Sequence, residues 1–278
     1  MIGMEARTGV PDTRSFVALG DSFTEGLSDL GPDGRSFAGW ADRFAERLAE
    51  VSPALRYANL AVRGNVLRDV AEVQVPRAIA MRPDLVSIAA GGNDLLSLRA
   101  DPDELARAFD DAVALLREAG CQVLVCTGFD PRTFPVIRLI RGRVAVFNMH
   151  LRAIAARREC HLLDLWSMRV LTDAREWSPD RLHLTSDGHR RVALRACEVM
   201  GVPVAADWRE PLPPVLPRRS RPGRPASWLA ARRGDARWVQ DHAAPWVSRR
   251  LRGVSAGDGA QPKRPELLAL HTACAGTR

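Results

Sequence analysis

Between residues 15 and 200, short apolar segments alternate with segments of helical periodicity, and this alternation restricts the fold strongly. Five of the short segments are apolar on both faces, which is typical of parallel strands covered by helices on both sides. The expected strands are Ser15–Leu19, Leu55–Leu60, Leu85–Ala89, Gln122–Cys126 and His161–Leu165. The expected helices are Ala38–Val51, Asp101 to Gly120, about Ile137 to Arg158, and Ser186–Met200. The pattern predicts a doubly wound α/β sandwich with a parallel sheet.

The composition changes after residue 208. Residues 209–278 carry 14 basic and 5 acidic side chains, so the net charge of +7 resides in this tail and the preceding body is near neutral. Proline and arginine dominate residues 209–226, which is typical of a semi-rigid linker. The expected organisation is a flexible N-terminus over 1–14, a main domain over 15–208, the linker, a helical extension over 227–252 and a disordered tail over 253–278.

No apolar run reaches the ~18 residues that a membrane span needs, and the first residues do not resemble a secretory signal. We therefore expect a cytoplasmic protein without a transmembrane segment. The five cysteines form no CxxC pair, so neither a disulfide framework nor a metal site is expected.

A serine follows the first expected strand directly, in the sequence Gly20-Asp21-Ser22. A hydroxyl at that turn is fixed by the strand, open to solvent and close to the first amides of the next helix. Taken alone, Gly-Asp-Ser is also a common sequence in turns without any catalytic role. Three later segments add to its significance.

These segments also lie at expected strand ends or in the loop before the last helix. Gly64 follows the second strand, the sequence Gly91-Gly92-Asn93-Asp94 follows the third, and Asp180 and His183 precede the last helix. Because a doubly wound sheet brings the carboxyl ends of its strands to one edge, we expect the four segments to meet there.

The four segments supply the groups that acyl transfer requires. Ser22 is the expected nucleophile, His183 its base and Asp180 the carboxylate that orients His183. The backbone N–H groups of Ser22 and Gly64, with the side-chain amide of Asn93, are expected to bind the oxyanion. No cofactor or metal ion is required.

The four segments, in this order, resemble the GDSL or SGNH hydrolase family of esterases and lipases over residues 15–200. The resemblance implies a three-layer α/β/α fold with a flavodoxin-like sheet, the Ser22, His183 and Asp180 triad, and an oxyanion hole of Ser22, Gly64 and Asn93. Phe23 replaces the leucine that gives the family its name. Gly20, Asp21, Gly92 and Asp94 are expected to support the site, and Asp21 is as well suited to holding the turn as to touching substrate.

The expected activity is hydrolysis of carboxylic esters, either lipid acyl esters or small acetyl esters. Alternatives are a thioesterase or acyltransferase at the same site, and a non-catalytic binding module that acts through its basic tail. The expected partner is a small-molecule ester. No nucleic-acid-binding module is recognised, while the arginine- and tryptophan-containing tail leaves open a weak contact with anionic or membrane surfaces.

Overall fold

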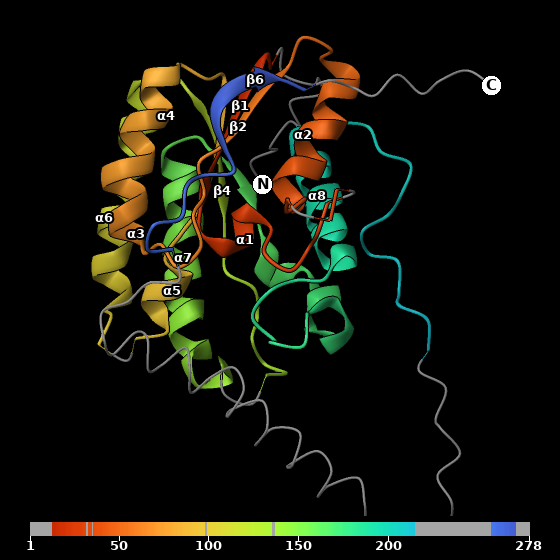
Figure 1. Cartoon of the computed structure of the whole chain (residues 1–278). Helices are drawn as coiled ribbons and strands as arrows, with labels where there is room; N and C mark the ends of the chain where they lie inside the picture. The colour runs from red at the N-terminus through yellow and green to blue at the C-terminus, as the bar shows by residue number, and fades with distance from the viewer. Residues whose placement is uncertain are drawn as a thin grey trace, which may run out of the picture.

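The computed structural model describes residues 13–31, 33–34, 36–97, 99–134, 137–214 and 257–270. The described strands form one sheet in the order β5-β4-β3-β1-β2-β6 (Figure 1). They are β1 Ser15–Gly20, β2 Arg56–Asn59, β3 Leu85–Ala89, β4 Gln122–Cys126, β5 His161–Leu163 and β6 Arg264–Ala269. The first five are parallel, and β6 pairs antiparallel with β2. The predicted parallel doubly wound sheet is confirmed.

Helices cover both faces of the sheet, which gives three layers. Helices α2 (Trp40–Val51) and α8 (Ser186–Met200) pack together on one face. On the other face α6 (Pro102–Glu118) and α7 (Arg141–Arg157) pack together, beside α3 (Leu67–Asp69) and α4 (Val75–Met81). Two short helices, α1 (Ser22–Glu25) and α5 (Gly92–Leu95), follow β1 and β3. No helix of the described residues is long and apolar enough to cross a bilayer.

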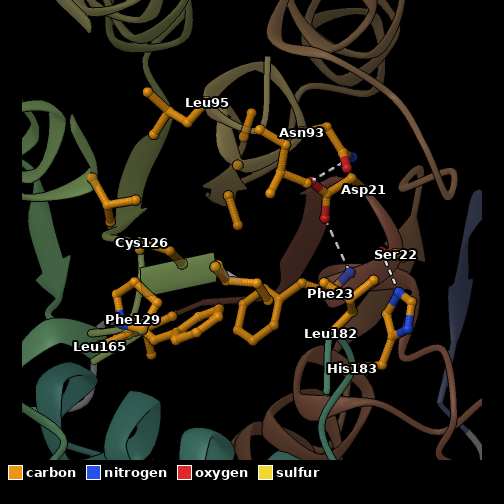
Figure 2. A pocket seen from close by; sticks show the side chains of 18 of the residues that line it. Asp21, Ser22, Phe23, Asn93, Leu95, Cys126, Phe129, Leu165, Leu182 and His183 are labelled. Carbon is orange, nitrogen blue, oxygen red and sulfur yellow. Dashed lines mark hydrogen bonds between the residues drawn. The ribbon is translucent and has the colours of Figure 1, made fainter. Parts of the chain in front are cut away.

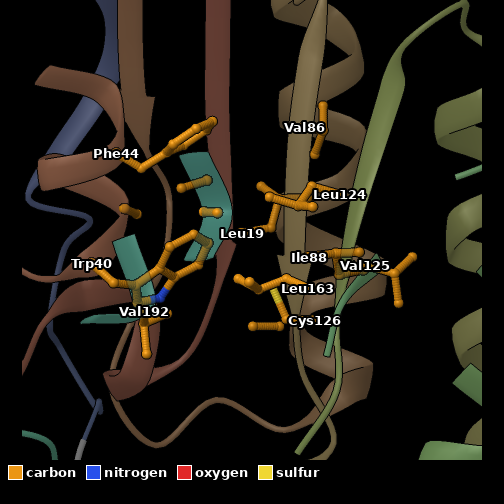
Figure 3. Close-up of a cluster of buried hydrophobic side chains, with 14 of the residues drawn as sticks. Leu19, Trp40, Phe44, Val86, Ile88, Leu124, Val125, Cys126, Leu163 and Val192 are labelled. Atoms are coloured by element: carbon orange, nitrogen blue, oxygen red, sulfur yellow. The ribbon is translucent and has the colours of Figure 1, made fainter. Parts of the chain in front are cut away.

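The apolar core fills the space between the sheet and these helices (Figure 3). Phe16 of β1 stacks on Tyr57 of β2 with ring centroids 5.3 Å apart, and it meets the ring of Phe44 on α2 edge-on at the same separation. All three rings are buried. Every residue of β1 is buried, so both faces of this strand are covered, as its apolar pattern predicts.

The segment between β2 and β3 is helical, although no helix was expected there from the sequence. Helix α3 continues through a π-helical turn, Val70–Gln74, into α4. A π turn shifts the side chains that follow it around the helix axis, so the apolar residues do not keep one 3.6-residue period.

The chain after residue 208 also differs from expectation. Residues 253–278 were expected to be disordered, but Arg264–Ala269 forms β6 and extends the sheet beyond β2. The expected limits of the main domain are therefore too narrow, because this strand belongs to the same sheet. Residues 209–214 contact the body of the protein, because the Arg191 guanidinium donates to the carbonyl oxygen of Glu210 and the Arg175 guanidinium donates to that of Pro213. Most of the expected linker and the helical extension over 227–252, like residues 1–12, lie outside the described residues.

Candidate active site

The end of β1 is held by contacts that leave Ser22 at the start of a helix. The side-chain amide of Gln74 pairs with the N–H and the carbonyl of Gly20, both at 2.8 Å. A Cβ atom on Gly20 would lie 2.5 Å from the carbonyl oxygen of Ala89, so only glycine fits this close approach of β1 and β3. Asp21 caps α1 by accepting the N–H of Phe23 at 3.0 Å. Ser22 is then the first residue of α1, where backbone N–H groups have no acceptor within the helix.

Asp180 and His183 lie in a tight loop ahead of α8. The loop is closed by the bridge between Trp177 and Leu184, and the N–H of Ser178 donates to the carbonyl of His183 at 2.8 Å. Nδ1 of His183 lies 2.7 Å from Oδ2 of Asp180. Nε2 of the same ring lies 2.9 Å from Oγ of Ser22 (Figure 2). The structure thus brings the serine hydroxyl, the imidazole and the carboxylate into one hydrogen-bonded chain.

The carboxylate of Asp180 stays ionised in this loop. Burial raises its pKa, but hydrogen bonds from His183, from the Ser178 hydroxyl and from the N–H of Leu182 outweigh the burial and hold the pKa well below its usual range. A carboxylate that is negative at all working pH values can stabilise a positive charge that forms on the imidazole.

Gly64 and Asn93 both line the pocket that Ser22 faces. Gly64 has a φ of +78°, a left-handed conformation that favours glycine. The amide of Asn93, on α5, donates to Oδ2 of Asp21 at 3.2 Å and to the carbonyl of Asn65 at 2.9 Å. These contacts fix the amide beside the turn that carries Ser22, and the longer one, to Asp21, is the weaker of the two.

The expected supporting residues hold neighbouring turns. Oδ2 of Asp94 accepts the N–H of Leu67 at 2.9 Å, which ties α5 to the start of α3. Gly92 lines the pocket, and a side chain there would meet no atom within 4 Å. Burial raises the pKa of Asp21 to about 6, because desolvation outweighs its hydrogen bond from Phe23.

Other polar residues near the site are already engaged. His189, on α8, is buried and accepts the N–H of Trp40 through Nδ1, and burial lowers its pKa to about 3, so it is a neutral packing residue. Arg63, next to Gly64, forms an ion pair with the carboxylate of Glu25. No group of His, Cys, Asp or Glu in the described part of the chain is arranged to hold a metal ion.

Two residues of the site could not be predicted from the sequence. Gln74 lies in the π-helical turn, and Ser178 donates to Oδ1 of Asp180 at 2.6 Å. Neither carries a local signal, because Gln74 lies 54 residues from Gly20 and Ser178 lies in an irregular loop.

A pocket of about 450 Å³ opens beside Ser22 and His183. Its other lining residues come mainly from the segments that follow β3, β4 and β5 and from the first half of α7. It lies at the carboxyl ends of the parallel strands, where doubly wound sheets bind their ligands.

Solved structures share this fold at low sequence identity. An alpha/beta hydrolase enzyme, LAE5, from the metagenome of Lake Arreo in Spain is 24% identical, with a TM-score of 0.58 over 72% of this chain and 99% of that one. A putative GDSL-like lipase from Parabacteroides merdae is 19% identical, with a TM-score of 0.62 over 71% and 100%. A variant of Axe2, an acetyl xylan esterase from Geobacillus stearothermophilus, is 21% identical, with a TM-score of 0.59 over 73% and 100%. No curated protein matches the chain.

The fold and the family together define the class, a carboxylic ester hydrolase. The GDSL-like Lipase/Acylhydrolase family matches residues 18–191, a span that includes Ser22, Gly64, Asn93, Asp180 and His183. The chain belongs to this family.

Proposed function

We propose that the protein cleaves carboxylic esters through an acyl-enzyme intermediate on Ser22. The observation that supports this most strongly is the chain from Ser22 Oγ to His183 Nε2, at 2.9 Å, and from His183 Nδ1 to Asp180, at 2.7 Å. A nucleophile, a base and an orienting group within hydrogen-bond distance of one another are the arrangement that activates a serine.

In the proposed reaction, Oγ of Ser22 attacks the ester carbonyl while Nε2 of His183 takes its proton. The imidazolium then gives this proton to the leaving alcohol oxygen, and the acyl group remains on Ser22. A water molecule, deprotonated by His183, attacks the acyl-enzyme, and the carboxylic acid leaves as the proton returns to Ser22. Asp180 holds the imidazole in position and stabilises its positive charge.

The negative oxygen of each tetrahedral intermediate is proposed to bind the N–H groups of Ser22 and Gly64 and the amide of Asn93. Asn93 can reach this oxygen by exchanging its 3.2 Å hydrogen bond to Asp21, since catalytic contacts are often longer in the free enzyme than in the transition state. Losing one such donor costs roughly 100-fold to 1000-fold in rate.

The test is hydrolysis of p-nitrophenyl butyrate by the wild-type protein and by Ser22→Ala, His183→Ala and Ser167→Ala. Ser167 is exposed and follows β5, outside the pocket, so it controls for the loss of a serine hydroxyl. We expect at least a 1000-fold loss of kcat in the first two variants and wild-type turnover in Ser167→Ala. Turnover by folded Ser22→Ala at near the wild-type rate would refute the proposal.

A further inference from the structure

The pocket continues well past the nucleophile. From Ser22 it passes Phe23 and reaches Cys126 at the end of β4, with Phe129 and Leu165 beside it (Figure 2). Its volume of about 450 Å³ far exceeds that of an acetyl group. A group of ten atoms or more fits, if each takes about the ~30 Å³ that a water molecule occupies in the liquid.

The part of the pocket that lies beyond Phe23 and reaches Cys126, Phe129 and Leu165, the inner pocket, has apolar walls. On one side the rings of Phe129 and Trp177 pack with centroids 4.2 Å apart. Ile140, at the end of a 3₁₀-helix, and Val144 and Phe147 of α7 also line the pocket, and all three are buried.

The polar residues that line the inner pocket use their polar atoms in hydrogen bonds to other protein groups, not to the cavity. The amide of Asn148 pairs with the carbonyl and the N–H of Gly128, both at 2.8 Å. The hydroxyl of Thr127 donates to Asp164 and accepts the N–H of Leu165. Burial raises the pKa of the Cys126 thiol, so this group stays neutral.

A hydroxylated group is therefore disfavoured in the inner pocket. Each hydroxyl that loses water there without a new partner destabilises the complex, whereas each methylene gains from burial. The inner pocket selects for an apolar chain.

The position of His183 indicates which half of an ester enters the inner pocket. The leaving oxygen must lie next to Nε2 of His183 to receive its proton. In Figure 2 Cys126, Phe129 and Leu165 lie on the other side of Phe23 from His183. The group that points away from His183, toward these residues, is the acyl group.

We propose that the substrates are esters of apolar acyl chains of about eight to twelve carbons, bound in this inner pocket, rather than acetyl esters of sugars or other polar alcohols. This inference rests on the proposed function, because it places the acyl chain relative to Ser22 and His183. Each methylene up to the length of the pocket is expected to raise kcat/KM about fourfold, the equivalent of about 0.8 kcal/mol.

The first experiment compares two ester series below their critical micelle concentrations. In p-nitrophenyl esters from acetate to dodecanoate only the acyl chain changes, and in acetates of alcohols from methyl to octyl only the leaving group changes. We expect kcat/KM to rise at least 100-fold from acetate to octanoate in the first series, with a small change in the second. A preference for acetate, or a rise confined to the second series, would overturn the inference.

The second experiment changes the pocket wall. Val144→Phe fills space in the inner pocket, and Val146→Phe, on the same helix but with Val146 42% exposed and outside the pocket, is the matched control. We expect the octanoate-to-acetate ratio of kcat/KM to fall at least tenfold in Val144→Phe and to stay within threefold in Val146→Phe. Val144→Ala, which enlarges the same wall, is expected to shift the best chain to greater length. If neither Val144 variant changes the ratio, the acyl chain does not bind in the inner pocket.

The two proposals fail in distinguishable ways. If no ester is hydrolysed and a fluorophosphonate does not label Ser22, the proposed function is wrong. If Ser22-dependent hydrolysis occurs but does not depend on acyl length, only the inference about the acyl chain is wrong.

Discussion

The two oxygens of Asp180 hold different partners. Oδ1 accepts the hydroxyl of Ser178 and the N–H groups of Leu182 and His183, which fixes the loop. Oδ2 faces Nδ1 of His183 and fixes the imidazole. One side chain therefore sets both the shape of the loop and the direction of the proposed base.

Asp180→Asn removes the negative charge of this side chain and keeps nearly the same shape. Asparagine offers one oxygen, so it cannot accept both the loop N–H groups and the proton on Nδ1, and it carries no negative charge. We expect kcat on a p-nitrophenyl ester to fall by roughly 1000-fold or more, with a folded protein by circular dichroism. Asp173→Asn, at a partly exposed turn outside the pocket, is the control and should keep wild-type kcat. A fall in kcat of less than tenfold in Asp180→Asn would contradict the role of Asp180 in orienting His183.

Glu176 is a buried carboxylate close to the same loop. Its side chain is fully buried, its Oε1 lies 2.9 Å from Nε of Arg191, and its carbonyl accepts the N–H of Thr185. Burial raises its pKa to about 7, more than the nearby Arg191 lowers it.

This raised pKa makes stability depend on pH. Between its unfolded pKa of 4.5 and about 7 the folded state holds the proton that the unfolded state has lost, so the free energy of unfolding falls as pH rises. Glu176→Gln keeps a neutral group of similar shape and lacks this dependence. From pH 5 to pH 8 we expect urea unfolding to show wild type losing about 2–3 kcal/mol relative to Glu176→Gln. Parallel pH profiles for the two proteins would contradict the raised pKa.

Among the elements, those with strong local patterns were predicted well. The predicted strand ranges overlap β1 to β5, and α8 begins and ends where its pattern predicts, because its cap Thr185 and the following Gly201 mark its ends. The strand β6 was missed because Pro265 and Glu266 are atypical of strands. It is stabilised by pairing with β2, more than 200 residues away, which no local pattern reveals.

A partly buried ion pair, whose two side chains are 16% and 18% exposed, joins the segment before β6 to the helices near the site. Nζ of Lys263 lies 2.5 Å from Oδ2 of Asp42 on α2. It also donates to the carbonyl oxygens of Phe37 and of Glu25, the last residue of α1. Lys263 thus links β6 to the helix that begins with Ser22.

Lys263→Met removes this link and leaves the partly buried carboxylate of Asp42 without its cation. We expect the free energy of unfolding at pH 7 to fall by about 2 kcal/mol, since breaking a partly buried pair leaves a carboxylate whose charge water compensates only in part. The matched control is Arg47→Met, whose ion pair with Glu50 is about half exposed at both side chains and is worth about 1 kcal/mol or less. Equal losses in urea unfolding of the two variants would show that β6 is not anchored through Lys263.

At the scale of the molecule, the site depends on parallel strands that end at one edge. Ser22, Gly64 and Asn93 follow β1, β2 and β3, and the loop of Asp180 and His183 meets them there. Their positions could be predicted because each follows the end of a recognisable strand or precedes a recognisable helix. The inner pocket could not, because its walls come from Phe129, Trp177 and one face of α7, which meet only through packing. The choice between lipid acyl and acetyl esters therefore stayed open in the sequence.

The central claim is that Ser22 is the nucleophile activated by His183, and covalent labelling tests it most directly. The full-length protein is incubated with a fluorophosphonate, digested, and the modified peptide identified by mass spectrometry. We predict one adduct on Ser22, absent in Ser22→Ala and formed at least 100-fold more slowly in His183→Ala. An adduct on another residue, or labelling of Ser22 at the same rate in His183→Ala, would contradict the account.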